Sequence, residues 1–184
     1  MTGHRVDTSD LLIRVEESSD CEAIAGVVAR AFASEAEARL VEAIRASPNF
    51  ARDWSLVAIR QSRLVGHVMV SYVGLRDGDV LRQIPSLSPL AVEPDMQGRG
   101  AGSALVRAVT ERVDAAGEPL IVLEGAPRYY ARFGFEYAVP LGIEIDLPAW
   151  APAEAAQVLR LRTYDARIRG KVAYPPAFEI VEDR

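Results

Sequence analysis

The sequence has few of the residues that disulfide bonds and metal sites require. Cys21 is the only cysteine among 184 residues, so the chain can form no internal disulfide bond. A zinc site of the Cys/His type needs more ligands than Cys21 and the two histidines, His4 and His67, supply. We therefore expect no metal site.

Long apolar stretches are also missing. A membrane-spanning helix requires about 18 or more apolar residues in a row, and no run in the chain approaches that length. Residues 1–10 contain no apolar segment like that of a signal peptide, and we expect them to form a flexible N-terminus. The prediction is a cytoplasmic protein that does not use a membrane as a partner.

Positive charge is low as well. Lys and Arg number 21 against 26 Asp and Glu, which gives a net charge of −5 and a sequence pI near 5.2. A surface that binds nucleic acid needs clustered Lys and Arg, so we expect no nucleic-acid partner. With 49% hydrophobic residues, the chain has enough apolar material for one domain, expected over residues 11–184.

What the sequence does contain is a glycine-rich loop between a buried strand, Leu87–Val92, and a helix that begins near Ala101 or Gly102. Gly117 is placed to end that helix, and Leu120–Leu123 forms the next apolar strand. A strand, helix and strand this close together favour a parallel crossover. The helix is predicted from an apolar stripe with spacings of three and four residues: Ala101, Ala104, Leu105, Ala108, Val109, Val113 and Ala116.

The loop has the chemistry of an anion site. Gly98, Gly100 and Gly102 let a ligand approach the backbone, and the first N–H groups of the helix can point at a phosphate or pyrophosphate. The alternative is that these glycines only form a tight turn. A Walker A loop would need a lysine, and the dinucleotide fingerprint would need glycine where Ser103 or Leu105 stands. A general nucleotide-binding module is therefore disfavoured.

Two motifs in this order resemble those of the GNAT family of acyl-CoA-dependent N-acyltransferases. Gln97–Gly102 matches the signature Gln/Arg-x-x-Gly-x-Gly/Ala, and Tyr130–Phe135 is similar to the segment Tyr-x-x-x-Gly-Phe. The resemblance extends from about Leu12 to Phe178 and is to a subgroup of small bacterial N-acetyltransferases. It implies a mixed α/β fold with a twisted, mostly antiparallel sheet, a splayed pair of parallel strands and helices on both faces.

The resemblance implies an enzyme that transfers an acetyl group directly from acetyl-CoA to a primary amine of a small molecule or peptide. The alternative is a non-catalytic acyl-CoA-binding sensor or interaction protein. A homodimer is compatible with either. The residues implied to bind acetyl-CoA are Leu90, Ala91, Val92, Gln97, Gly98, Arg99, Gly100, Ala101, Gly102, Ser103, Tyr130 and Phe133, with Leu90 and Val92 pairing with the pantetheine arm through their backbone.

The resemblance also suggests catalytic roles. Tyr130 matches the family tyrosine that protonates the departing CoA thiolate, although it could instead pack against the cofactor. Several family members carry a glutamate as general base eleven residues before the position of Gln97, and here that residue is Ser86. The remaining base candidates are Glu124, a water chain and His67, which could equally be a structural residue of the sheet.

The last third of the chain gives weaker patterns. Ile143–Leu147 alternates like a strand, and Ala155–Leu161 fits a helix or a strand by propensity. The resemblance favours a strand there, paired with the one before it. We expect Tyr174–Phe178 to cover the end of the sheet, and the first two helices, ending near Phe32 and Ala46, to border the acceptor side of the cleft.

Overall fold

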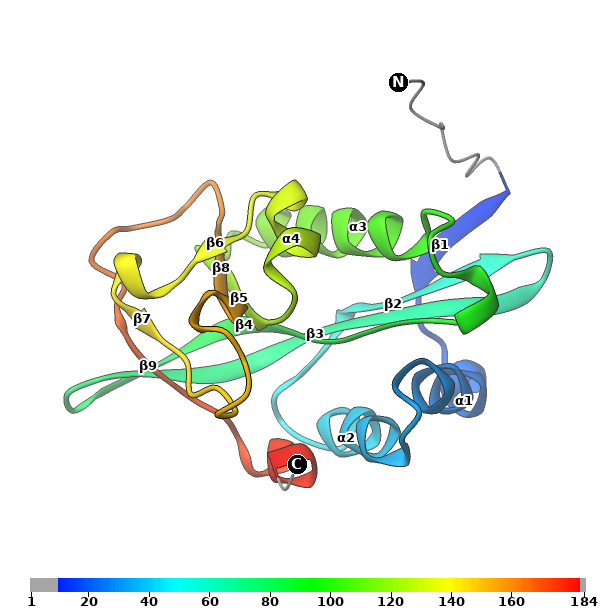
Figure 1. Ribbon diagram of the computed structural model, residues 1–184, viewed down its shortest axis with the longest axis horizontal. Helices are drawn as coiled ribbons and strands as arrows, with labels where there is room; N and C mark the ends of the chain where they lie inside the picture. The colour runs from blue at the N-terminus through cyan, green and yellow to red at the C-terminus, as the bar shows by residue number, and fades with distance from the viewer. Residues whose placement is uncertain (1–9, 183–184) are drawn as a thin grey trace.

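The computed structural model describes residues 10–182, so most of the N-terminal segment expected to be flexible lies outside the described residues. Within them, strands form one twisted sheet in the order β1-β2-β3-β4-β5-β8-β6, with β9 beside β3 and β7 beside β9 (Figure 1). The strands are β1 Leu11–Val15, β2 Phe50–Arg60, β3 Arg63–Asp77, β4 Val80–Val92, β5 Leu120–Glu124, β6 Glu136–Tyr137, β7 Ile143–Glu144, β8 Ala156–Arg160 and β9 Gly170–Ala173.

The helices cover both faces of the sheet, as expected, with α1 and α2 on one side and α3 and α4 on the other (Figure 1). The helix predicted to begin near Ala101 or Gly102 begins at Ala101, and its apolar stripe buries Leu105, Val109 and Val113. None of the helices in the described part of the chain is long and apolar enough to cross a membrane. Their bounds are α1 Cys21–Phe32, α2 Glu35–Arg45, α3 Ala101–Ala115, α4 Pro127–Tyr130 and α5 Glu179–Glu182.

The sheet is mostly antiparallel, and it forks where β4 and β5 run in parallel. These two strands pair in register only at Ser86 and Val122. Beyond this point β4 carries a bulge at Ser88 and Pro89, because Leu87 lies opposite Val70 while Leu90 lies opposite Val68. The predicted parallel crossover and the splayed pair are both confirmed.

The pairing of the C-terminal strands differs from the expectation. Ala155–Leu161 does contain a strand, β8, but it pairs with β5 and β6. The strand expected over Ile143–Leu147 has only two residues and pairs in parallel with β9. Pro148 and Pro152 follow it, and since proline has no amide hydrogen to donate, the chain leaves the sheet there and returns at Ala156 beside β5.

The core consists of two apolar clusters, one on each face of the sheet. Side chains of β5 alternate between them, so Leu120 and Val122 join the cluster beneath α1 and α2, whereas Ile121 and Leu123 join the cluster beneath α3. This alternation predicts the direction of the next side chain. Glu124 belongs on the α1 and α2 face.

Candidate active site

The glycine loop has a backbone that side chains would disfavour. Gly98 and Gly100 have φ values of 72° and 90°, in the left-handed region that glycine adopts without steric cost. Gly100 is the N-cap of α3, and no side chain caps the helix. The Gln97 amide donates a hydrogen bond of 3.2 Å to the Val92 carbonyl and closes the loop. The N–H groups of the first turn of α3 are thus available to an anion.

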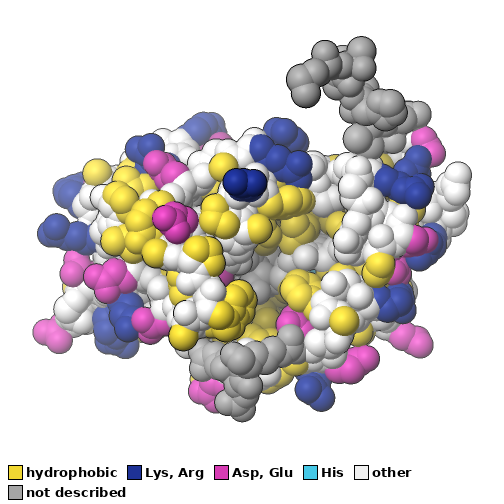
Figure 2. Space-filling model, in the orientation of Figure 1, with side chains coloured by type: hydrophobic (Ala, Val, Ile, Leu, Met, Phe, Trp, Pro, Cys, Tyr) yellow, Lys and Arg dark blue, Asp and Glu magenta, His cyan; other side chains and the backbone are white. Residues whose placement is uncertain are grey.

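Beside this loop lies a groove with a volume of about 390 Å³. Figure 2 shows the surface hollowed in the middle of the view, between the α4 and α1 sides. Of the residues expected to bind the cofactor, the groove is lined by Leu90, Val92, Gln97, Gly98, Gly100, Gly102 and Ser103. Three further residues line it that we did not select from the sequence, namely Met96, Tyr129 and Arg132.

The end of β4 presents an open edge to the groove. On its β3 side, Leu90 pairs with Val68 and Val92 with Gly66. On the β5 side, no described strand pairs with β4 beyond Ser86. A strand edge of this kind offers backbone N–H and C=O groups to an extended ligand. Ala91 differs from its neighbours, because its side chain is buried in the cluster beneath α1 and α2.

Tyr129, rather than Tyr130, lies against the glycine loop. A Cβ atom on Gly102 would sit 2.6 Å from the Tyr129 hydroxyl, so the glycine makes room for that side chain. The Arg132 guanidinium lies over the Tyr129 ring, with its Cζ 4.2 Å from the ring centroid, and holds positive charge beside the groove. Arg132 lies within the segment Tyr130–Phe135, and Tyr129 directly precedes that segment. Their positions in the sequence are the signal that points to both as groove residues.

The other residues expected to bind the cofactor do not line the groove. Arg99 is exposed at the loop, and Ala101 is buried in the first turn of α3. The Phe133 ring packs against the Tyr129 ring, with 5.6 Å between the ring centroids. Their roles remain predictions.

Tyr130 is the last residue of α4, and its side chain lies beside Gly125, just after the end of β5. Its ring covers Gly125, where an added Cβ would come within 2.5 Å of the ring, and it meets Phe135 edge-on. Burial raises the pKa of Tyr130, and the neighbouring Tyr129 adds to this effect. The hydroxyl therefore keeps its proton at neutral pH, as a general acid requires. Tyr130 therefore lies against the backbone at Gly125, the residue that follows Glu124.

Glu124 lies at the C-terminal end of β5, just past the fork. Its Oε1 accepts a hydrogen bond of 2.6 Å from the Tyr174 hydroxyl. Ser86, at the position of the family glutamate, is 1% exposed and pairs with Ser71 on β3. A serine hydroxyl is too weak a base for this role by itself. On β5, the carboxylate closest in sequence to the fork is that of Glu124.

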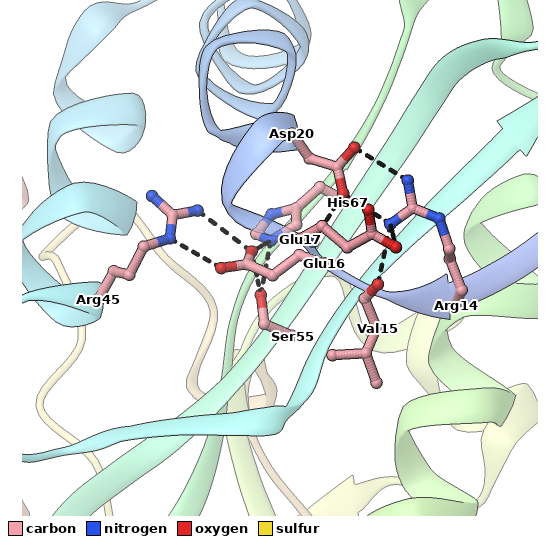
Figure 3. Close-up of polar contacts among 8 residues, drawn as sticks. All are labelled: Arg14, Val15, Glu16, Glu17, Asp20, Arg45, Ser55 and His67. Atoms are coloured by element: carbon pink, nitrogen blue, oxygen red, sulfur yellow. Dashed lines mark hydrogen bonds and ion pairs between the residues drawn. The ribbon is translucent and has the colours of Figure 1, made fainter.

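His67 lies in a different place, in a buried network beneath α1 and α2 (Figure 3). Its Nε2 is 3.0 Å from Ser55 Oγ and 3.3 Å from Glu16 Oε2. Ser55 donates its hydrogen to Glu16 at 2.6 Å, and the carboxylate has no hydrogen, so Nε2 of His67 carries one. Burial lowers the pKa of His67, although the bond to Glu16 opposes this. His67 is 0% exposed and does not line the groove.

In residues 10–182, no group of three or more His, Cys, Asp or Glu side chains lies close enough together to hold a metal ion.

Known proteins resemble this chain in sequence and in fold. Residues 13–138 match the family model described as an acetyltransferase (GNAT) domain. The uncharacterized N-acetyltransferase YhbS of Escherichia coli is 32% identical over 152 residues, which cover 82% of this chain and 87% of YhbS. A crystal structure of YhbS in complex with CoA superimposes with a TM-score of 0.82 and covers 92% of both chains.

A second solved structure agrees. It is a GNAT family acetyltransferase from Brucella melitensis in complex with acetyl-CoA, 30% identical, with a TM-score of 0.72 and coverage of 91% of this chain and 97% of that chain. The family model spans more than half of the chain, and it lies over β1 to β6 with the glycine loop and the aromatic segment inside it. The chain therefore belongs to the GNAT family of acetyltransferases and is an acyltransferase.

Proposed function

We propose that this protein transfers an acetyl group from acetyl-CoA directly to a primary amine of a small molecule or peptide, with residues 11–184 acting as one domain. The observation that carries the proposal is the groove between the uncapped start of α3 and the open edge of β4. This combination suits a ligand with a pyrophosphate at one end and an extended amide arm at the other. The two solved relatives are described as complexes with CoA and acetyl-CoA.

The cofactor is placed by the residues that line the groove. The pyrophosphate binds the N–H groups that follow Gly100, and the guanidinium of Arg132 attracts the phosphates. The pantetheine arm pairs with the backbone of Leu90 and Val92 as an added strand. This leaves the thioester at the fork between β4 and β5, between Ser86 and Glu124.

The chemistry at the fork is a direct acyl transfer. The amine nitrogen attacks the thioester carbonyl carbon, the C–N bond forms, the C–S bond breaks, and CoA leaves as a thiolate. Glu124 accepts the proton that the nitrogen loses, and Tyr130 donates its hydroxyl proton to the sulfur. Solvent then returns a proton from Glu124 to Tyr130. Holding the thioester and the amine together supplies much of the rate.

The two faces of the sheet separate the two substrates. The groove of the cofactor involves Leu90 and Val92, which pack with the cluster on the α3 face. Glu124 continues the alternation of β5 toward the opposite face. The amine therefore approaches from the side of α1 and α2.

Calorimetric titration of the purified protein tests the cofactor assignment. We expect saturable binding of acetyl-CoA and CoA and none of ATP, which lacks the pantetheine arm. Release of free thiol is then followed with a panel of primary amines: spermidine, an aminoglycoside and a peptide with one lysine. Binding without thiol release would favour the acyl-CoA sensor, for which the buried Ser86 at the glutamate position is the supporting observation. No binding of either thioester or CoA would contradict both proposals.

The substitution Gly102→Ala tests the groove itself. The new Cβ would meet the Tyr129 hydroxyl at 2.6 Å and Val92 at 3.4 Å, so the tyrosine must shift within the groove. We expect the Kd of acetyl-CoA to rise about 10-fold, equivalent to about 1.4 kcal/mol. Alanine is otherwise better than glycine in a helix by up to about 1 kcal/mol, so Tm should not fall. An unchanged Kd in calorimetry would show that Tyr129 does not shape the binding site.

A further inference from the structure

The proposed base, Glu124, is hydrogen-bonded to Tyr174, a residue of the C-terminal segment. We propose that Tyr174 is a positioning residue that holds the carboxylate of Glu124 in the orientation needed to take the proton from the amine. This inference rests on the proposed function, because it assigns a partner to the base of the same site. Its starting point is the hydrogen bond of 2.6 Å from the Tyr174 hydroxyl to Glu124 Oε1.

The sheet brings these residues together from distant parts of the sequence. β2 pairs with β3 only up to Ser71. Beyond that residue, β9 takes the place of β2 along the same edge of β3 and pairs with Gly74–Arg76. Tyr174 is the residue directly after β9. The chain then runs toward α2 (Figure 1). The alternation of side chains along β5 directs Glu124 toward the same face of the sheet.

The ring of Tyr174 is itself held in place. It packs against Phe178 with 4.9 Å between ring centroids, and Phe178 is 5% exposed within the cluster beneath α1 and α2. Tyr174 joins that cluster as a partly buried member. Its hydroxyl is therefore a fixed donor, and Phe178 anchors it to the core.

The backbone at Glu124 is also held in place. Gly125, which follows Glu124, donates its N–H to the Ala155 carbonyl at 3.1 Å and accepts a hydrogen bond of 2.9 Å from the Gln157 amide. Glu124 itself pairs with Ala156 on β8. The backbone of the base is thus fixed by β8, and Tyr174 fixes the end of its side chain.

Such an arrangement suits a general base. A carboxylate has about four lone-pair sites, so a hydrogen bond from Tyr174 is compatible with acceptance of a proton from the amine. A glutamate side chain without such a partner would sample several rotamers, and small misplacement of a reacting group can cost up to about 100-fold in rate. The tyrosine restricts this sampling before the amine arrives.

The test compares Tyr174→Phe with Glu124→Gln and with the double variant. Tyr174→Phe keeps the ring on Phe178 and removes only the hydroxyl. We expect kcat to fall about 10-fold, with KM for acetyl-CoA within about 2-fold of the parent. Because Tyr174 acts through Glu124, the double variant should be no slower than Glu124→Gln alone.

The chain offers a matched control. The Tyr72 hydroxyl donates to Glu118 Oε1, also at 2.6 Å. Glu118 lies before the other end of β5, about 20 Å from Glu124 along the strand. Tyr72→Phe removes the same kind of bond, so it should change Tm by a similar amount while leaving kcat unchanged.

The acceptor in these assays is the fastest amine of the panel, or water in the slow hydrolysis of acetyl-CoA when no amine of the panel reacts. Two results would overturn the positioning role. One is an unchanged kcat for Tyr174→Phe, and the other is a double variant whose loss of kcat equals the product of the two single losses. If Glu124→Gln has no effect on thiol release, or neither amine nor water reacts, the assignment of the base falls and Tyr174 with it. Binding of acetyl-CoA would then still separate this failure from failure of the cofactor proposal.

Discussion

Replacing Tyr130 with phenylalanine should lower kcat about 100-fold, because a positioned general acid typically contributes at least this much to the rate. The ring would keep its place over Gly125 and against Phe135, so the groove should be preserved. The Kd of acetyl-CoA should stay within about 3-fold of the parent. Steady-state kinetics with the amine, together with calorimetry, measures both quantities.

Tyr129→Phe is the comparison for this prediction. Tyr129 is the neighbouring tyrosine, but it lines the groove near Gly102. Removal of the Tyr129 hydroxyl should raise the Kd of acetyl-CoA by a larger factor than it lowers kcat. If Tyr130→Phe instead weakens binding and leaves kcat unchanged, then Tyr130 packs against the cofactor and another group protonates the thiolate.

The burial of Tyr130 adds a condition to the same experiment. Since burial raises its pKa above the ordinary value of 10.0, the hydroxyl stays protonated over the whole range in which the enzyme is assayed. A falling limb of kcat between about pH 8 and pH 9.5 that disappears in Tyr130→Phe would contradict this protonation state.

The second large effect concerns stability rather than catalysis. Glu16→Gln should lower the free energy of unfolding by about 3 kcal/mol, the lower end of the range for breaking a buried ion pair. Glu16 is bound to Arg45 at 2.7 Å, and the two side chains are 6% and 16% exposed. Glutamine has no negative charge, so it is a weaker acceptor than the carboxylate for the guanidinium of Arg45 and for the other donors of the network (Figure 3). Denaturant unfolding measures the difference.

The same network gives stability a defined dependence on pH. Burial alone would raise the pKa of Glu16, but hydrogen bonds from His67, Arg45 and Ser55 outweigh it and hold this pKa far below its ordinary value of 4.5. A lowered pKa means that the unfolded chain binds a proton first as the pH falls. The stabilisation is therefore complete above about pH 5 and declines progressively below pH 4.5. The gap between the parent and Glu16→Gln should narrow over that acidic range.

Glu42→Gln is the matched control for Glu16. Glu42 contacts the same guanidinium of Arg45 at 2.6 Å, but its side chain is 53% exposed. A solvent-exposed ion pair contributes at most about 1 kcal/mol, so this change should be small. Equal losses for the two variants would show that burial does not strengthen the bond to Glu16.

The sequence alone was sufficient for the glycine loop and the elements around it. The stripe that includes Leu105, Val109 and Val113 predicts α3 because helix periodicity is a local property. The left-handed backbone at Gly98 and Gly100 likewise follows from which residue can adopt it. The parallel pairing of β4 with β5 follows from a general rule about crossovers. Membership of the GNAT family came from two motifs in order.

Tertiary structure decided how the chemistry-bearing side chains are grouped. Tyr129 and Tyr130 are adjacent in sequence, and only the docking of α4 places the first on the glycine loop and the second over Gly125. Tyr174 is 50 residues from Glu124, and His67 is 51 residues from Glu16. No local pattern encodes such contacts, because they depend on which strand edges meet and which faces are covered. The sequence therefore determined the family and the glycine loop, and packing of distant segments determined which side chain contacts Glu124, the proposed base.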